Sequence, residues 1–141
     1  QAAVIRVKLP HLNKWHQQRQ DNAAHYNKLF NENNLGKFVN LPITKHSTKL
    51  KNPHIFNQYV IKVKRRDELR SFLADKHIAS EIYYPLPFHL QECFQNLGGK
   101  QGDFPVSEEA AAEVLALPIY PGMTIAMREF VVDQIVNFYL A

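Results

Sequence analysis

The chain opens with apolar or bulky residues at steps of three and four, the spacing of one continuous stripe along a helix. The stripe consists of Ala2, Ile5, Leu9, Leu12, Trp15, Arg19, Ala23, Tyr26 and Phe30. Pro10 falls inside this stripe, and a proline within a helix removes a backbone hydrogen bond and bends the axis. The pattern therefore predicts one long, kinked helix over residues 1–35, ended by Gly36.

Alternation between apolar and polar positions indicates strands further along the chain. Tyr59, Ile61 and Val63 alternate with lysines, which gives a strand one apolar face and one polar face. Pro42 cannot donate a backbone hydrogen bond, so a strand that contains it belongs at a sheet edge. Strands are expected over residues 38–43, 55–64 and 78–83, with a polar loop over 44–53.

Start signals indicate three shorter helices. Asp67 and Thr124 are residue types that accept hydrogen bonds at helix starts, and Pro105 suits a first helical position. The apolar faces are expected to be Leu69, Phe72 and Leu73; Ala111, Val114 and Leu115; and Met127, Val131, Ile135 and Phe138. The order α, β, β, α, β, α, α predicts an α+β domain with a short, mostly antiparallel sheet covered by helices.

Composition narrows the class of protein. The chain has 141 residues, of which 45% are apolar and 21% charged, enough for one domain with a core and against intrinsic disorder. The net charge of +4 is spread over the chain as in solvated faces, which disfavours nucleic-acid binding. The single cysteine, Cys93, fits a protein of the reducing cytoplasm, and its side chain is expected to be buried. No apolar run in the sequence is long enough to span a bilayer.

The most informative stretch for function is residues 82–91, Ile-Tyr-Tyr-Pro-Leu-Pro-Phe-His-Leu-Gln, named here the arm. Its two prolines stiffen the backbone just where a strand is expected to end. Loops at strand ends often carry binding groups, so Tyr83, Tyr84 and His89 are candidates for a binding site. The alternative is an ordinary loop that covers the core with aromatic side chains.

Standard catalytic signals are missing from the sequence. It contains no phosphate-binding glycine loop, no nucleophile elbow, no paired-cysteine metal pattern and no H-E-x-x-H spacing among its seven histidines. Schiff-base chemistry needs a lysine that is desolvated or lies beside another cation. Lys62 and Lys64 lie on the polar face of their predicted strand instead. We therefore predict no catalytic residue and no metal site within this chain.

Several segments together resemble the DegT/DnrJ/EryC1/StrS family of sugar aminotransferases. They lie in the family's order over essentially the whole chain. The matching segments are QAAVIRVKLPHL (1–12), NQYVI (57–61), RDEL (66–69), YYPLPFHLQ (83–91), GDFPVSE (102–108) and LPIYP (117–121).

This resemblance implies a pyridoxal-phosphate (PLP) enzyme of aminotransferase fold type I. Such enzymes move an amino group, usually from glutamate, onto a keto carbon of a nucleotide-linked sugar in polysaccharide or deoxysugar biosynthesis. The chain resembles only the small C-terminal domain, with residues 1–35 as an interdomain and dimer helix and 36–141 as the α+β part. The Schiff-base lysine and the cofactor site would then lie in a preceding N-terminal domain, and this chain alone would be inactive.

The resemblance also implies a role for the arm as one wall of a substrate cleft in a homodimer. Tyr83, Tyr84 and His89 match substrate-side positions, although Tyr83 stands where many members have histidine. Asn57 and Gln58 are further candidates, or they satisfy nearby backbone groups. Two alternatives remain: a dehydratase or regulator of the same family, or a free-standing binding module.

Overall fold

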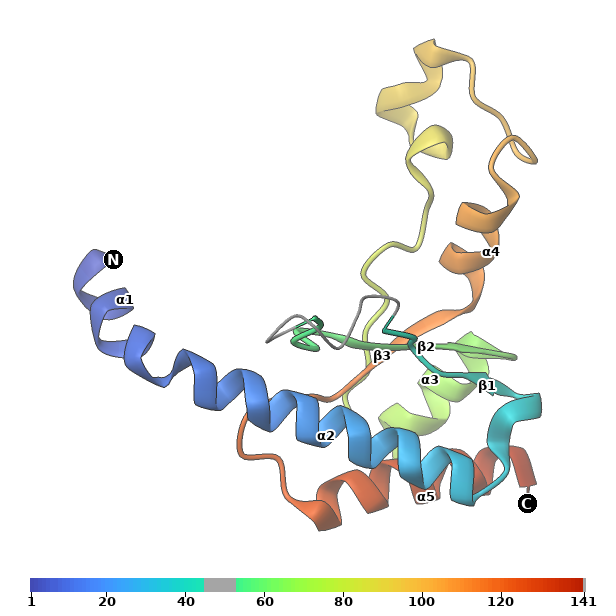
Figure 1. Cartoon of the computed structure of the whole chain (residues 1–141). Helices are drawn as coiled ribbons and strands as arrows, with labels where there is room; N and C mark the ends of the chain where they lie inside the picture. The colour runs from blue at the N-terminus through green and yellow to red at the C-terminus, as the bar shows by residue number, and fades with distance from the viewer. Residues whose placement is uncertain (45–52, 141) are drawn as a thin grey trace.

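The computed structural model describes residues 1–44 and 53–140, and it centres on a three-stranded antiparallel sheet (Figure 1). The strands are β1 (Val39–Asn40), β2 (Tyr59–Val63) and β3 (Val114–Leu117), in the order β1-β2-β3. The edge strand and the central strand were predicted and are confirmed, although both are shorter than expected. The predicted loop over 44–53 lies almost wholly outside the described residues.

The predicted third strand was wrong. Residues 78–83 make only an isolated bridge, in which Glu81 and Ala116 exchange both backbone hydrogen bonds. The third strand is instead β3, although Val114 and Leu115 were assigned to a helix face. The run Val-Leu-Ala-Leu is apolar at every position, and a run this short suits a buried strand as well as a helix. Residues 114–117 form a strand because they pair with β2.

The long N-terminal helix is kinked where Pro10 predicted. Helix α1 (Ala2–Lys8) passes through a 3₁₀ turn at Leu9–His11 into α2 (Leu12–Glu32). The predicted stop at Gly36 was wrong, because α2 ends at Glu32 and Asn34 takes the left-handed conformation, with φ 56°. Asparagine tolerates the left-handed conformation better than most residues, so Asn34 can end the helix in place of Gly36.

One face of the sheet is covered by α2, α3 (Arg66–Asp75) and α5 (Ile125–Leu140). The core lies between these helices and the apolar side of β2. The fully or almost fully buried side chains there are Tyr26, Phe30, Tyr59, Ile61, Val63, Leu69, Leu73, Leu115, Val132 and Ile135. The α+β fold with a small antiparallel sheet and a long N-terminal helix is therefore confirmed.

Of two predicted helix caps, Thr124 is confirmed and Asp67 was wrong. Thr124 caps α5, since its Oγ1 accepts a hydrogen bond from the Met127 N–H at 3.2 Å. Asp67 does not cap α3. The residue before α3 is Arg65, and the Asp67 carboxylate accepts a bond from Arg66 Nε at 2.6 Å instead. A carboxylate in the first turn still complements the helix dipole.

Between the bridge at Glu81 and β3, the chain leaves the sheet as the arm, a lobe (residues 92–104) and α4 (Pro105–Glu113). In Figure 1 this excursion rises on the opposite side of the sheet from α2 and α5. Cys93 lies in the lobe and is exposed, so its predicted burial was wrong. None of the described helices has the length and apolar content needed to cross a membrane.

Candidate functional site

The candidate site is the face of the sheet that α2, α3 and α5 leave uncovered. On this face Val60 pairs with Ala116, and Lys62 with Val114. A hollow of about 210 Å³ lies beside it, lined by Asn57, Gln58, Glu81, Tyr83, Ala116 and Ile119 among others. A larger hollow of about 560 Å³ shares Asn57 and Gln58 as lining residues. The open face therefore offers amide and phenol groups around a small apolar floor.

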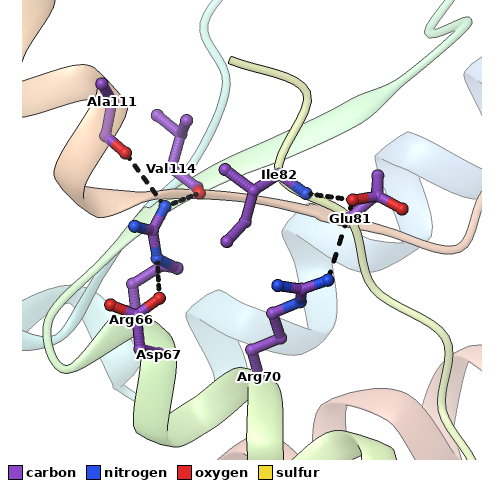
Figure 2. Close-up of polar contacts among 7 residues, drawn as sticks. All are labelled: Arg66, Asp67, Arg70, Glu81, Ile82, Ala111 and Val114. Carbon is purple, nitrogen blue, oxygen red and sulfur yellow. Dashed lines mark hydrogen bonds and ion pairs between the residues drawn. The ribbon is translucent and has the colours of Figure 1, made fainter. Parts of the chain in front are cut away.

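The start of the arm is anchored to the sheet by Glu81. Its backbone pairs with Ala116 at 2.8 and 3.1 Å, and its Oε1 accepts a bond from the Ile82 N–H at 2.9 Å. Figure 2 shows Arg70 reaching the same carboxylate from α3, at 3.9 Å. These contacts fix the direction in which Tyr83 and Tyr84 leave the sheet.

The far side of the open face depends on Arg66, an arginine whose side chain is buried. Its Nη1 donates to the carbonyls of Ala111 at 3.0 Å and Val114 at 3.1 Å (Figure 2). These carbonyls lie where α4 ends and β3 begins, and a helix end leaves such groups without partners. Arg66 therefore holds the junction that places β3 beside β2.

Asn57 and Gln58 are presented by an unusual turn that sequence reasoning missed. Phe56 has φ 48°, a conformation that bulky residues rarely adopt. Its N–H donates to His54 Nδ1 at 3.0 Å, and the two rings lie 4.2 Å apart. No glycine marks this turn in the sequence. A backbone outlier of this kind is often kept where it orients functional groups.

The structure brings four of the five predicted site residues together. Asn57, Gln58 and Tyr83 line the 210 Å³ hollow, and a smaller hollow of about 50 Å³ is lined by Gln58, Tyr83 and Tyr84. Tyr84 also borders an apolar groove of about 300 Å³ between the arm and α4. Its side chain is largely exposed, and so a ligand on the open face could reach it.

His89 lies apart from these four residues. Its Nε2 is 2.9 Å from Glu108 Oε1, at the start of α4, and it lines a different, apolar hollow in the lobe. Burial raises the pKa of Glu108, but hydrogen bonds from Gly102, His89 and Phe104 outweigh burial and lower it overall. Glu108 lies in the first turn of α4, where an acidic side chain complements the helix dipole.

Similarity to known proteins decides the family. Residues 1–136 match the model of the DegT/DnrJ/EryC1/StrS aminotransferase family. The chain belongs to this family. It is 42% identical to a pleiotropic regulatory protein of Geobacillus stearothermophilus over 99% of the chain and 36% of that protein. It is 33% identical to the dTDP-3-amino-3,6-dideoxy-alpha-D-galactopyranose transaminase of Aneurinibacillus thermoaerophilus, over 96% of the chain and 34% of that enzyme.

Solved structures agree with this family assignment. The fold matches S. venezuelae DesV in complex with a ketimine intermediate with a TM-score of 0.87, at 31% identity, over all of this chain and 36% of DesV. It matches a DegT DnrJ EryC1 StrS aminotransferase from Brucella abortus with a TM-score of 0.82, at 29% identity. The chain spans about a third of the length of these family members.

PLP forms its Schiff base with an activated lysine, so the lysines among the described residues of this family member bear on cofactor binding. None of the lysines among them is buried, and the least exposed, Lys62, lies 2.8 Å from Glu109. The hydrogen bond that Lys62 donates to Glu109 raises the pKa of Lys62, whereas a Schiff-base lysine needs its pKa lowered. Within residues 1–44 and 53–140, no group of histidine, cysteine and acidic side chains is arranged to hold a metal ion either.

Proposed function

We propose that the protein to which this chain belongs is a PLP-dependent aminotransferase that moves an amino group from glutamate to a keto-sugar nucleotide. In this proposal the chain supplies the sugar-side wall of the active site, and other residues hold the cofactor. The family match supports the reaction class, as does the likeness to transaminases named for dTDP-linked amino sugars. The gathering of Asn57, Gln58 and Tyr83 around one hollow is the observation that carries the role of this chain.

The chemistry of the open face suits a sugar. Sugar hydroxyls both donate and accept hydrogen bonds, and side-chain amides and phenols do the same. We assign Asn57, Gln58, Tyr83 and Tyr84 as substrate contacts. A substrate role for His89 stays a prediction, because its Nε2 is already bonded to Glu108.

The test uses the complete polypeptide with bound PLP. Adding glutamate alone should convert the cofactor spectrum from the aldehyde form to the amine form, and adding a nucleotide-linked keto sugar should reverse it. The sugar product should carry a new amino group by mass spectrometry. A spectrum that glutamate leaves unchanged would refute the proposed reaction.

The 141-residue chain by itself should not carry out this reaction. Mixed with PLP, it should give no stoichiometric, borohydride-reducible Schiff base on any single lysine, because none of the described lysines is desolvated and Lys62 is paired with Glu109. Stoichiometric labelling of a single lysine would contradict this part of the proposal.

A second candidate function is regulatory, since the 42% identical relative is named a pleiotropic regulatory protein. A regulator would bind the sugar nucleotide without any change of the cofactor spectrum by glutamate. A dehydratase would yield a sugar that has lost a hydroxyl and gained no nitrogen. The same spectra and masses therefore separate the three possibilities.

We also propose a cytoplasmic homodimer that works in polysaccharide or deoxysugar biosynthesis. Support for association comes from α1 and the turn after it, where Val4, Ile5, Val7 and Leu9 are all more than half exposed. Apolar patches of this kind often mark interfaces. The exposed thiol of Cys93 is compatible with a reducing compartment.

A further inference from the structure

The arm is attached at both ends, and the second attachment is a partly buried polar cluster around Glu108. This carboxylate accepts bonds from the backbone N–H of Gly102 at 2.9 and 3.0 Å and of Phe104 at 3.3 Å, and it lies 2.9 Å from His89 Nε2. An ionised carboxylate can only accept, so His89 Nε2 carries a proton and donates. The two side chains are only 11% and 18% exposed.

The imidazole of His89 is also held by close packing. The Phe104 ring centroid lies 4.8 Å from that of His89. Gly99 approaches so closely that a Cβ at this position would lie 3.0 Å from the His89 Cβ and 3.1 Å from its carbonyl oxygen. The lobe is therefore folded around His89, and the ring has little freedom to turn toward a ligand.

The backbone between His89 and the two tyrosines is stiff. Pro85 and Pro87 fix their own φ angles, and Pro87 is buried. The Pro87 carbonyl accepts a bond from the Leu90 N–H at 3.0 Å, and the Leu86 carbonyl accepts one from the Gln91 side chain at 3.4 Å. A displacement at His89 would therefore be passed along the arm rather than absorbed within it.

We propose that the His89–Glu108 pair is a positioning device, which fixes the far end of the arm on α4 and thereby sets Tyr83 and Tyr84 over the open face of the sheet. His89 and Glu108 are then positioning residues that act through the two tyrosines. Glu81 holds the near end and the pair holds the far end. This inference rests on the proposed function for its kinetic consequences only.

The rival explanation is that His89 binds the substrate directly. Under that explanation Glu108 matters little, and any losses from changing both residues multiply. Under the positioning explanation, the double variant loses no more function than Glu108→Ala alone, because that single change already breaks the pair. His89→Gln should recover part of the function, since its amide nitrogen lies near the place of Nε2.

The test combines amide hydrogen exchange with kinetics on the complete, PLP-loaded protein. In Glu108→Ala, the amides of Leu90 and Gln91 should exchange faster, while the core amides of α2 and α5 stay protected. The KM for the keto-sugar nucleotide should rise about 5-fold or more, the low end of typical coupling between sites. The half-reaction with glutamate should be unchanged.

Glu109→Ala is the matched control, because it removes the neighbouring carboxylate, which faces Lys62 instead of His89. It should leave the exchange of the arm unchanged. Unaltered exchange of the arm in Glu108→Ala would overturn the proposal, and so would faster exchange without a change in KM or multiplicative losses in the double variant. If glutamate produces no half-reaction in the wild type, the proposed function fails, and the exchange result then decides for or against the pair alone.

Discussion

At the scale of single residues, two buried arginines hold together segments that are far apart in sequence. Arg66 joins α3 to the end of α4 through its bonds to the Ala111 and Val114 carbonyls. Arg128 on α5 donates to the Met123 carbonyl at 2.6 Å, to the Asn22 side chain and to His25 Nδ1 at 2.9 Å. Both were invisible to the sequence analysis, because an arginine bonded to carbonyls has no pattern of its own. Burial of a cation is tolerated only where such partners are supplied.

Replacing Arg66 by methionine tests this role. The change leaves the carbonyls of Ala111 and Val114 without a donor, and should lower the free energy of unfolding by about 2–3 kcal/mol. Arg65→Met is the control, since Arg65 is exposed and solvent screens its pair with Glu68, so the loss should be much smaller. Urea unfolding measures both. Equal losses in the two variants would contradict the assigned role of Arg66.

The carboxylate of Glu108 gives a prediction about pH. Because hydrogen bonds lower its pKa in the fold, its stabilising effect is complete above the ordinary glutamate value of 4.5 and is lost as the pH falls through the lowered pKa. The Gly102 amide resonance, read by NMR, should titrate with a midpoint below 4.5. It should lose this step in Glu108→Gln. A midpoint at or above 4.5 would contradict the contacts described here.

At the scale of elements, the sequence predicted those whose pattern repeats and missed those that tertiary contacts decide. The kink at Pro10 and the alternation of Tyr59, Ile61 and Val63 are local properties, and both are confirmed. The assignment of Val114 and Leu115 failed because an apolar run does not reveal its partner strand. The site residues Tyr83 and Gln58 were predicted by resemblance, but their common hollow depends on long-range pairing.

The cap of α5 gives a prediction at this scale. Thr124→Ala removes the acceptor for the Met127 N–H and should destabilise the chain by about 1 kcal/mol. Thr124→Ser keeps the hydroxyl and should retain most of that stability. Thermal unfolding of the three proteins distinguishes these outcomes. A serine variant as unstable as the alanine variant would show that the cap contributes little.

At the scale of the whole molecule, two surfaces are left exposed to solvent: the apolar stripe of α1 and the open face of the sheet. In Figure 1, α1 forms the free end of the long helix and extends away from the sheet. Ile5 and Leu9 are each about 60% exposed. Contact of these apolar side chains with water is unfavourable, so burial against a partner surface would stabilise the protein.

The chain should therefore self-associate in solution through α1. The double variant Ile5→Glu/Leu9→Glu should shift it toward monomer in sedimentation velocity runs. Asn13→Glu, a charge placed at an exposed polar position of α2, is the control and should change nothing. A wild-type chain that stays monomeric at high micromolar concentration would count against the interface.

The central claim is that the open face binds the sugar, and a pair of half-reactions on the complete PLP-loaded protein tests it most directly. Gln58→Ala and Tyr83→Phe should each raise the KM for the keto-sugar nucleotide by about 2- to 10-fold, the worth of one hydrogen bond. The rate and affinity of the half-reaction with glutamate should stay at their wild-type values. Variants that leave the sugar half-reaction unchanged, or that impair only the one with glutamate, would contradict the claim.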